Sequence, residues 1–358
     1  MVAEKLNDTE VPAPGPAPHA LVDPQGRVRY GVYNSPFERV SLNDARWTTA
    51  LGVNAPRALR KMRLKRWQHF CLVHPEALVT CAVVDAAYLK TSWVQFVDLN
   101  GGLRLEHHQQ APRADVAISD ALFDGTTHFR RRRYELSVRN HLDAGRHTLR
   151  IDIGQDARRG LPAISGELRA LHPMGQDRIE PLVVALPLHN QRAMYSHKVA
   201  LPVEGRLSIG RRCLLFDPSE CFAILDIHAA HYPHHTWWKW ATFATKVGKH
   251  RVALNLTRNV VVGEELNENA IWLDGKLQRL DTALFERVGQ RWRVGSRDSR
   301  VDLTFTPLGA RTENLNLGVV RSRFEQFYGR FHGSLRHGDE VVDIDGAVGL
   351  FEDHDSKW

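Results

Sequence analysis

Cysteine is scarce in this sequence, with four residues in 358, and no two of them form a C-x-x-C pair. Thiols this few and this scattered argue against a disulfide framework and against a zinc finger. The first ten residues, MVAEKLNDTE, lack the basic and apolar regions of a secretory signal. Together these absences predict a cytoplasmic protein whose cysteines are buried free thiols. They are Cys71, Cys81, Cys213 and Cys221.

Long apolar runs are also absent, because no uncharged stretch approaches the ~18 residues that a bilayer span needs. Lys and Arg (48) exceed Asp and Glu (41) by 7, which permits weak attraction to nucleic acid or anionic lipid but demands neither. The densest basic run, Arg130–Arg133, has no nucleic-acid-binding signature beside it, and we expect a solvated strand end or loop there. We therefore expect no nucleic-acid partner and no transmembrane segment, with a peripheral membrane contact left open.

Motifs for several reaction classes are missing as well. The chain has no G-x-G-x-x-G after a strand, no phosphate-binding loop, no G-x-S-x-G elbow and no H-E-x-x-H. Nucleotide-dependent chemistry and serine hydrolysis are therefore disfavoured, and we expect no cofactor.

The sequence does contain many short apolar or alternating runs separated by turn residues. They have strand length and are rich in β-branched and aromatic residues. Only 55–65 predicts a helix, and a short one. This spacing predicts an all-β fold, a mainly antiparallel sandwich or barrel. The predicted strands lie within 78–89, 91–99, 147–153, 181–188, 251–257, 270–280 and 300–308.

Two features bear on domain organisation. Four prolines within Val11–Pro18 favour extended, polyproline-like backbone, so residues 1–19 are predicted to be a disordered tail. CAVVD at Cys81–Asp85 and CFAILD at Cys221–Asp226 each place an apolar strand before an aspartate, which indicates duplication. The sequence thus predicts two similar β domains, residues 20–185 and 186–358, divided near the proline-flanked segment 181–190.

The stretch Leu225–Phe243, LDIHAAHYPHHTWWKWATF, holds four of the 19 histidines and three of the nine tryptophans. If 220–228 is a strand, Asp226 and His228 share one face behind two apolar residues. Such a setting tends to hold a carboxyl group in its neutral form.

The second half of this stretch predicts a hairpin. Pro233 is expected to turn the chain, and 236–244 to return as the partner strand. Alternation then places Trp238 and Trp240 on one side of the strand and Trp237 on the other.

Three interpretations of the stretch stay open. One is a buried turn in which the histidines are hydrogen-bonded and the tryptophans are core residues. Another is an aromatic-lined cavity with Asp226 and His228 in its wall. The third is a metal site, since zinc favours imidazole, although the spacing matches no metalloprotease motif. Its ligands would be His228, His231, His234 and His235.

Two further segments hold candidate residues. NENAIW, Asn267–Trp272, places two amides and Glu268 before an apolar strand, an arrangement that is usually a turn. Glu268 would otherwise be a second carboxylate for acid/base work, because paired carboxylates in different environments can divide those roles. The closing GLFEDHDSKW ends on Trp358, which we expect to dock on the last sheet.

From about Leu21 to Trp358 the chain resembles a bacterial family catalogued as domain of unknown function 2804. Many relatives carry a glycine and a basic residue where this chain has Ala229 and Ala230. If that basic residue contacts ligand, the ligand preference of this chain differs. The resemblance is carried by KRWQHFCLV, SHKVALPVEG, FAILDIH, HYPHHTWWKW, NENAIWLDGKL, VDLTFTP, QFYGRFHG and GLFEDHDSKW, with Asp85 and Tyr88.

More remotely, such proteins are similar to a superfamily of paired lipocalin-like barrels that includes carotenoid hydratase, tocopherol cyclase and fungal pericyclase enzymes. This resemblance implies two lipocalin-like or calycin-like antiparallel barrels, or strongly curved sheets, packed together. It also implies that the partner is a hydrophobic small molecule, often isoprenoid, bound between or inside the barrels.

Our first hypothesis is an enzyme, a hydratase, isomerase or cyclase acting by acid/base catalysis on a lipid or isoprenoid-like substrate. A neutral carboxyl group would protonate an alkene, and indole faces would stabilise the cation. Asp226 is the candidate acid, His228 tunes or reprotonates it, Tyr232 orients it and Glu268 activates water. The candidate ligand-binding residues are Lys198, His231, Trp237, Trp238, Trp240, Asn269 and Trp272.

Two other hypotheses belong to different classes. A noncatalytic lipid or terpenoid carrier needs no ionisable group in its wall, because barrels hold apolar ligands without one. A metal-dependent enzyme would use the histidine cluster. The sequence leaves the substrate, the direction of reaction and the oligomeric state open.

Overall fold

The computed structural model describes residues 14–49, 51–111, 115–175, 178–261, 266–316 and 321–357. Trp358 and residues 1–13 of the predicted tail lie outside these ranges. Residues 14–19 contact the folded body, since Gly15 forms a bridge with Tyr33 and the Ala17 N–H donates to Ser35 Oγ at 2.9 Å. This described part of the predicted tail is therefore ordered against the body.

The first sheet has fourteen antiparallel strands within the described ranges, and its main path runs β5-β4-β3-β2-β14-β12-β10-β9-β8-β7-β6. Short strands β1, β11 and β13 pair off this path. The bounds are β1 (Gly31–Tyr33), β2 (Lys65–His74), β3 (Ala77–Asp85), β4 (Lys90–Asp98), β5 (Arg104–Ala111), β6 (Asp115–Ala117), β7 (Gly125–Arg131), β8 (Tyr134–His141), β9 (Arg146–Ile153), β10 (Ile164–Leu171), β11 (Leu182–Leu188), β12 (Arg192–Ile209), β13 (Arg212–Phe216) and β14 (Phe222–Ala230).

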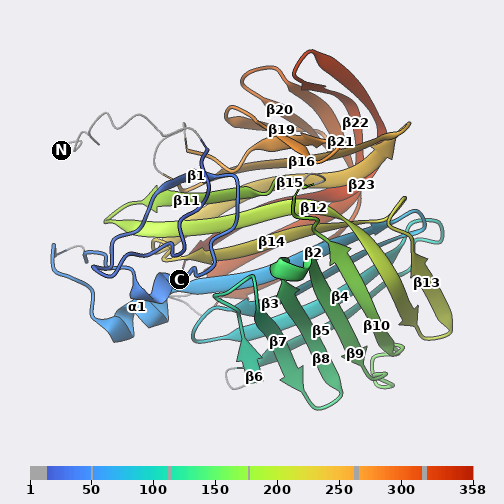
Figure 1. The fold of residues 1–358 in the computed structure, drawn as a ribbon. Helices are drawn as coiled ribbons and strands as arrows, with labels where there is room; N and C mark the ends of the chain where they lie inside the picture. Colours follow the sequence, from blue (N-terminus) through green and yellow to red (C-terminus); the bar gives the residue numbers. More distant parts are fainter. Residues whose placement is uncertain are drawn as a thin grey trace.

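The second sheet has nine antiparallel strands in the described part of the chain, in the order β18-β17-β16-β15-β23-β22-β21-β20-β19. Its three longest strands, β21, β22 and β23, lie side by side at its centre and bend strongly (Figure 1). The bounds are β15 (His235–Val247), β16 (His250–Asn259), β17 (Ala270–Leu273), β18 (Lys276–Arg279), β19 (Ala283–Val288), β20 (Arg291–Ser296), β21 (Val301–Asn316), β22 (Arg321–His337) and β23 (Glu340–Lys357).

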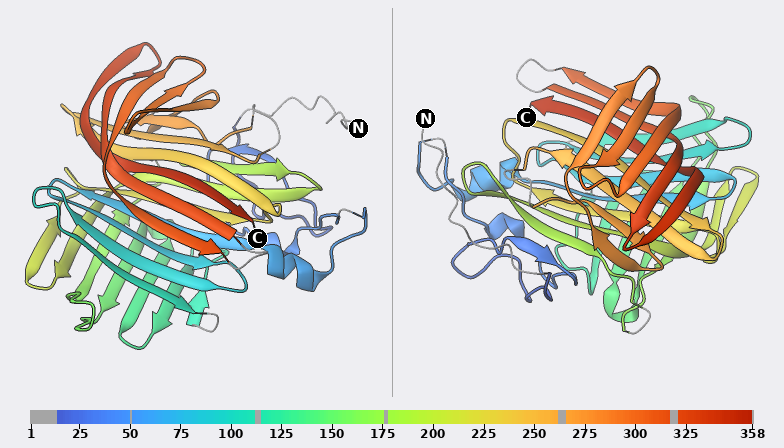
Figure 2. Two further views of the ribbon diagram at one scale, coloured as in Figure 1. Left: turned by 180° about the vertical axis from the view of Figure 1, so that it is seen from behind. Right: turned by 90° about the horizontal axis from the view of Figure 1, so that it is seen from above.

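Both sheets curl into half-barrels, and the orange-red strands β21–β23 lie over the blue and cyan strands β2–β5 (Figure 2). Helical structure in the described residues is limited to α1 (Arg57–Arg63) and two single turns, Leu42–Asp44 and Leu142–Ala144. None of the helices within these described ranges is long and apolar enough to cross a membrane. The predicted all-β fold of two strongly curved antiparallel sheets is confirmed.

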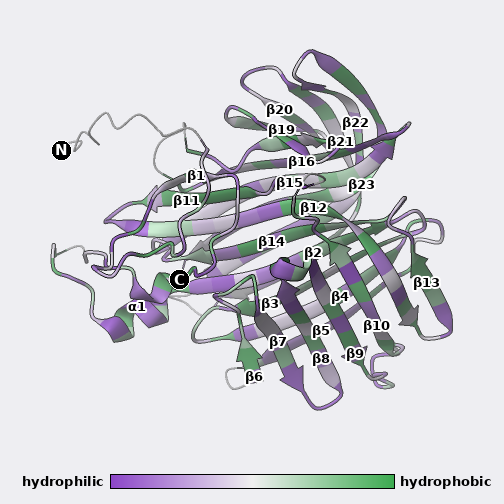
Figure 3. Cartoon of the chain, viewed as in Figure 1, coloured by the Kyte–Doolittle hydropathy of each residue, from purple (hydrophilic) through white to green (hydrophobic). Residues whose placement is uncertain are grey.

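Apolar side chains follow the period-two alternation of the strands and form separate clusters (Figure 3). On β14, Ala223 and Leu225 pack into the core inside the first half-barrel. Phe222 and Ile224, on the other face, pack against residues of both sheets. Because β14 is buried on both faces, any polar side chain on it must find its partners inside the protein.

Two local predictions require correction. HYPHH does not make a hairpin, because β14 pairs with β2 and β12 whereas β15 pairs with β16 and β23. The segment 231–234 instead carries the chain from the first sheet to the second. The two strands of the supposed duplication, β3 and β14, flank β2 within one sheet and so are not equivalent strands of two barrels.

The predicted division at residues 185/186 falls inside β11, a strand of the first sheet. The sheets change over at 231–234, between the end of β14 and the start of β15. If the chain is divided into two domains, we therefore propose that the boundary lies at this connection.

Candidate functional site

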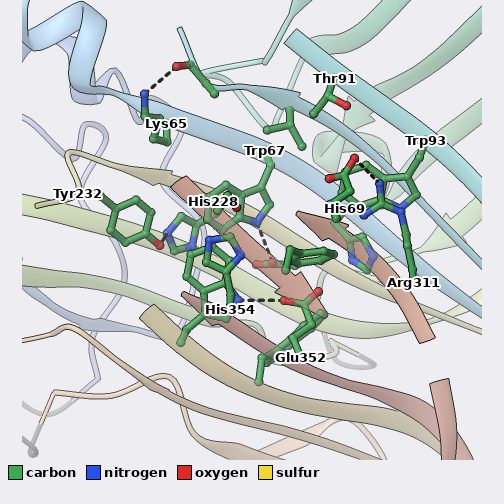
Figure 4. Close-up of a pocket in the computed structure, with 18 of the residues that line it drawn as sticks. Lys65, Trp67, His69, Thr91, Trp93, His228, Tyr232, Arg311, Glu352 and His354 are labelled. Carbon is green, nitrogen blue, oxygen red and sulfur yellow. Dashed lines mark hydrogen bonds and ion pairs between the residues drawn. The ribbon is translucent and has the colours of Figure 1, made fainter. Parts of the chain in front are cut away.

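A cavity of about 290 Å³ lies between the two sheets. Strands β2, β4, β12 and β14 contribute to its wall from the first sheet, and β15, β21, β22 and β23 from the second (Figure 4). The wall is rich in rings, so the aromatic-lined cavity among the three interpretations is present. Its largest rings are Trp67, Trp93, Trp238, Trp240, Tyr88, Tyr232 and Phe324.

Asp226 lies in the middle of β14 with its side chain in the cavity wall. One carboxylate oxygen accepts a hydrogen bond from Lys198 Nζ at 2.9 Å, and the other accepts from Trp67 Nε1 at 2.9 Å. Lys198 is opposite Asp226 in the ladder between β12 and β14, and its ammonium is also 3.6 Å from Glu268 Oε2. The three groups form a buried charged cluster.

The protonation state of Asp226 differs from the prediction. Burial raises its pKa, but Lys198, His228 and the hydrogen bonds from Trp67 and Lys198 outweigh burial, so the pKa lies below its ordinary value. Burial lowers the pKa of Lys198, yet Asp226 and Glu268 raise it overall. Asp226 and Lys198 are therefore an ion pair. The expectation that Asp226 is held neutral is wrong, because a buried cation stands beside it.

His228 contacts two other rings of the site. Its imidazole stacks on the Trp67 indole, with centroids 4.0 Å apart and planes 2° from parallel. Its Nε2 shares a hydrogen bond of 2.6 Å with the Tyr232 hydroxyl. Burial lowers the pKa of His228 to about 3, so the ring is neutral, and burial raises the pKa of Tyr232. The pair is a neutral, rigidly held hydrogen-bonded unit.

Glu352 faces the same cavity from β23. Its oxygens accept hydrogen bonds from Trp238 Nε1 at 3.0 Å and from Gln326 Nε2 at 2.6 Å. His354 stacks on the Trp238 indole, with centroids 3.8 Å apart and planes 1° from parallel. Burial raises the pKa of Glu352 to about 7, although Trp238 and Gln326 counteract part of that rise. Near neutral pH this carboxyl group is about half protonated.

Asp226 and Glu352 belong to two half-sites built on the same strand pattern. In each, a carboxyl residue and the histidine two positions later lie on a middle strand, and a tryptophan pairs with that histidine on a neighbouring strand. The strand on the other side places one residue opposite the carboxyl group. The Asp226 half-site consists of Asp226, His228, Trp67 and Lys198; the Glu352 half-site consists of Glu352, His354, Trp238 and Gln326.

Glu268 is a third buried carboxyl group of the cavity. Its Oε1 accepts a hydrogen bond from Asn259 Nδ2 at 2.9 Å, and burial raises its pKa despite the proximity of Lys198. It lies two residues before the start of β17, in the segment that the sequence also allowed to be a simple turn.

The structure brings most of the candidate residues together. Those in the cavity wall are Asp226, His228, Tyr232, Glu268, Lys198, Trp238 and Trp240. Four others lie elsewhere. Trp237 projects from the other face of β15, and the His231 ring lies 5.9 Å from Trp47. Asn269 bonds to the backbone of Thr257 and Asp281, and Trp272 Nε1 donates to the carbonyl of Glu180 at 2.6 Å.

Two of the four histidines proposed as metal ligands bond to different side chains. His228 bonds to Tyr232, and His235 Nε2 lies 2.9 Å from Asp355. Across the described ranges, no group of three or more His, Cys, Asp or Glu side chains is placed to hold a metal ion.

Sequence reasoning missed Glu352 and His354, and with them Trp67, His69, Trp93 and Arg311. A signal existed: Asp226-Ile227-His228 and Glu352-Asp353-His354 have the same carboxyl-x-histidine spacing. In the C-terminal GLFEDHDSKW the sequence pointed only to Trp358, and Trp67 and His69 stood out only as part of a family motif.

Solved structures resemble this chain in fold. A crystal structure of CghA with Sch210972 has a TM-score of 0.52 and 12% identity, covering 82% of this chain and 88% of that one. A second crystal structure of CghA has a TM-score of 0.51 and 12% identity, covering 82% of this chain and 87% of that one. A crystal structure of kievitone hydratase from Nectria haematococca has a TM-score of 0.44 and 9% identity, covering 82% of this chain and 88% of that one. At 12% identity, the likeness to the two CghA structures establishes the fold alone.

A search of curated proteins finds no significant match. The family model described as Domain of unknown function (DUF2804) matches residues 9–358, nearly the whole chain. Because this match covers nearly the whole chain, the family expected from the sequence is confirmed. The motifs that resemble the family include strands of both half-sites. The chain belongs to the DUF2804 family.

Proposed function

We propose that this protein is an enzyme that performs acid/base chemistry, a hydration, isomerisation or cyclisation, on a largely apolar small molecule held between the two sheets. The observation that carries the proposal is the contrast between two buried carboxyl groups in one cavity. Asp226 is ionised beside Lys198, whereas the pKa of Glu352 is raised by burial to about 7. Carboxyl groups whose environments push their pKa values apart divide acid and base roles in enzymes.

Glu352 is the proton donor in this proposal, in place of Asp226. Its O–H proton moves to one carbon of a substrate double bond, leaving the Glu352 carboxylate and a carbocation. In a hydration, water adds to the cation and its extra proton returns to Glu352. In an isomerisation, the Glu352 carboxylate instead takes a C–H proton from the carbon next to the cation, and a new double bond forms. Both routes restore the acid; a hydration consumes one water, and an isomerisation consumes no second reactant.

The cavity wall suits a positively charged intermediate. Trp67 and Trp238 hold their rings flat against the neighbouring imidazoles, which fixes both indoles in the wall. An indole face attracts a cation by about 0.5–2 kcal/mol. The Asp226 carboxylate, which cannot donate a proton, places fixed negative charge nearby. Glu268, whose pKa burial raises, remains the candidate to position water.

The fold comparison supports a ligand between or within such sheets. CghA, whose TM-score to this chain is 0.52, was crystallised with Sch210972. A protein with this fold therefore binds a small molecule, and we extend that property to the present cavity. A lipid or isoprenoid-like ligand fits the ring-rich wall.

The first experiment identifies the ligand. Native mass spectrometry of freshly purified protein, followed by solvent extraction, is expected to release an apolar molecule from wild-type protein. Candidate substrates related to it are then incubated with wild-type and E352Q protein. We expect turnover to fall by about 10²–10⁴-fold in E352Q, with ligand affinity retained. Wild-type turnover in E352Q would remove Glu352 from the role.

The carrier hypothesis is tested by the same material. A carrier returns its ligand unchanged after prolonged incubation, and E352Q then has no effect on any product.

A fluorescence titration needs no substrate: Trp238 donates directly to Glu352, so tryptophan emission is expected to change with a midpoint near pH 7 in wild type and not in E352Q. D226N is the matched control and should keep a transition, shifted to lower pH because the Asp226 charge helps to raise the pKa of Glu352.

A further inference from the structure

Three polar side chains that the proposed chemistry does not use meet at one end of the cavity. His69 projects from β2, Trp93 from β4 and Arg311 from β21, and all three line the cavity wall (Figure 4). The exposed fractions of Arg311, His69 and Trp93 are 1%, 4% and 8%. Each side chain is therefore more than nine-tenths buried, where a polar atom needs a partner.

These side chains form one packed unit. The Arg311 guanidinium lies 4.3 Å from the Trp93 ring and 5.5 Å from the Phe324 ring. The His69 ring is 6.3 Å from that of Trp93 and 5.7 Å from that of Trp240. The guanidinium is thus held between ring faces, with little freedom to turn toward solvent.

Several of their polar atoms have no hydrogen-bond partner among the described residues. These are Trp93 Nε1, both ring nitrogens of His69 and Arg311 Nη1. Other unpartnered buried atoms occur, such as Trp47 Nε1 and the His231 ring nitrogens, but those residues do not line the cavity. Leaving buried donors unpaired costs free energy, so a cluster of them in a cavity wall indicates a place for a ligand acceptor.

The charge around Arg311 selects the kind of acceptor. Its Nε donates to Glu106 Oε1 at 2.9 Å, and its Nη2 lies 3.1 Å from Glu313 Oε1. Arg104 Nη2 also donates to Glu106 Oε2 at 2.8 Å, so two guanidinium groups and two carboxylates balance each other here. A ligand carboxylate would add an uncompensated negative charge beside the buried Arg311 side chain, which repulsion and desolvation disfavour. A neutral carbonyl oxygen accepts the same hydrogen bonds without that cost.

We propose that the ligand of this cavity carries a carbonyl group whose oxygen binds at the end formed by Arg311, Trp93 and His69. The inference rests on the proposed function, because it names the polar group of the apolar substrate. The Phe324 ring lies 5.5 Å from the Arg311 guanidinium, and its centroid lies 5.5 Å from that of the His354 ring. One small molecule can therefore contact this end and the Glu352 half-site together.

Three probes of one shape test the proposal: cyclohexyl methyl ketone, cyclohexanecarboxylate and ethylcyclohexane. Their affinities are measured at pH 8 by calorimetry and by tryptophan emission, which none of the probes obscures. We expect the ketone to bind on the order of tenfold more tightly than either of the others, since a hydrogen bond from a charged donor is worth that much. Equal affinities, or tightest binding of the carboxylate, would overturn the proposal.

Variants separate this end of the cavity from the rest. R311M should remove the ketone preference while leaving the affinity for ethylcyclohexane nearly unchanged. Because R311M disturbs a buried ion pair, W93F is the second variant; it keeps a ring beneath the guanidinium and should lower only the ketone affinity, by a fewfold. W292F, a tryptophan outside the cavity wall, is the matched control and should change none of the three affinities.

The outcomes distinguish this inference from the proposed function. If ethylcyclohexane binds and the ketone has no advantage, the carbonyl proposal fails and the apolar cavity stands. If none of the three probes binds to well-folded wild-type protein, the cavity does not accept small apolar molecules, and both proposals fail.

Discussion

In the Asp226 half-site the residue opposite the carboxyl group is Lys198, whereas in the Glu352 half-site the corresponding position is Gln326. The remaining parts correspond: an indole N–H donates to each carboxyl group, and an imidazole stacks on each indole. An ammonium group offsets the effect of burial and leaves Asp226 ionised. A neutral amide does not, and burial raises the pKa of Glu352 to about 7.

The comparison teaches that burial alone does not decide which carboxyl group is the acid. Both groups are almost fully enclosed and both accept an indole hydrogen bond. Their protonation states differ because one neighbouring side chain differs in charge. Two copies of one strand pattern thereby provide an anion and a neutral acid on opposite walls of one cavity.

The largest expected effect comes from giving Asp226 the neighbour that Glu352 has. K198Q leaves a buried carboxylate without its cation, so the free energy of unfolding at pH 7 should fall by about 3–5 kcal/mol. Urea denaturation followed by tryptophan fluorescence measures the loss. K198Q/D226N removes the charge as well and should recover much of it. If K198Q is as stable as wild type, the ion pair does not hold Asp226 in its ionised form.

The two carboxyl groups should make the pH dependence of stability differ in sign. The pKa of Glu352 is raised from 4.5 to about 7, so the folded protein binds the proton more tightly than the unfolded chain between these values. Glu352 therefore stabilises the fold below pH 4.5, and roughly 3 kcal/mol of that contribution is lost as the pH rises to 7. Relative to wild type, E352Q should be more stable at pH 8 than at pH 5.

Asp226 supplies the matched comparison. Its pKa is lowered from 3.8, so its contribution is present above that value and is lost as the pH falls through the lowered pKa. D226N should therefore be less stable than wild type at neutral pH and lose that difference in acid, whereas E352Q should be more stable than wild type at pH 8. Parallel unfolding curves for the two variants at every pH would show that the half-sites do not differ in charge.

The sequence predicted which face of its strand each site residue occupies better than it predicted which strands pair with one another. Strict alternation along 220–228 and 236–244 placed Asp226, His228, Trp238 and Trp240 on the correct faces, because strand periodicity is a local property. Pro233 correctly predicted that the strand ends in this segment, because β14 ends at Ala230 and β15 begins at His235. The proline could not show that the next strand joins a different sheet, since strand pairing depends on distant residues.

The protonation states could not be predicted from the sequence. Lys198 lies 28 positions from Asp226, and only the pairing of β12 with β14 brings the two together. Glu352 was missed because all six residues of EDHDSK are polar, a composition typical of a solvent-exposed segment. Instead β23 lies inside the second sheet, between β15 and β22, with one face of that run against the cavity.

Converting the second half-site to the first is the next test. Q326K should place an ammonium beside Glu352, lower its pKa and leave it ionised at neutral pH. Turnover should then fall by about a hundredfold at pH 7, and the emission transition near that pH should disappear. Q326M is the neutral control: it should keep turnover, and because it removes a hydrogen bond that lowers the pKa of Glu352, it should move the emission transition to higher pH. Full activity in Q326K, with the lysine ammonium shown to be charged, would contradict the assignment of Glu352 as the acid.

The smallest expected difference concerns the two indole N–H groups. W67F removes a donor from an ionised carboxylate, which should cost about 2 kcal/mol of unfolding free energy at pH 7, because hydrogen bonds to charged groups are stronger than neutral ones. W238F removes a donor from a half-protonated carboxyl group and should cost about 1 kcal/mol. Because the Trp238 hydrogen bond lowers the pKa of Glu352, W238F should also move the pH dependence of turnover toward alkaline pH, and W67F should not. Equal costs and identical pH profiles for the two variants would mean that Lys198 and Gln326 do not set the charge of their half-sites.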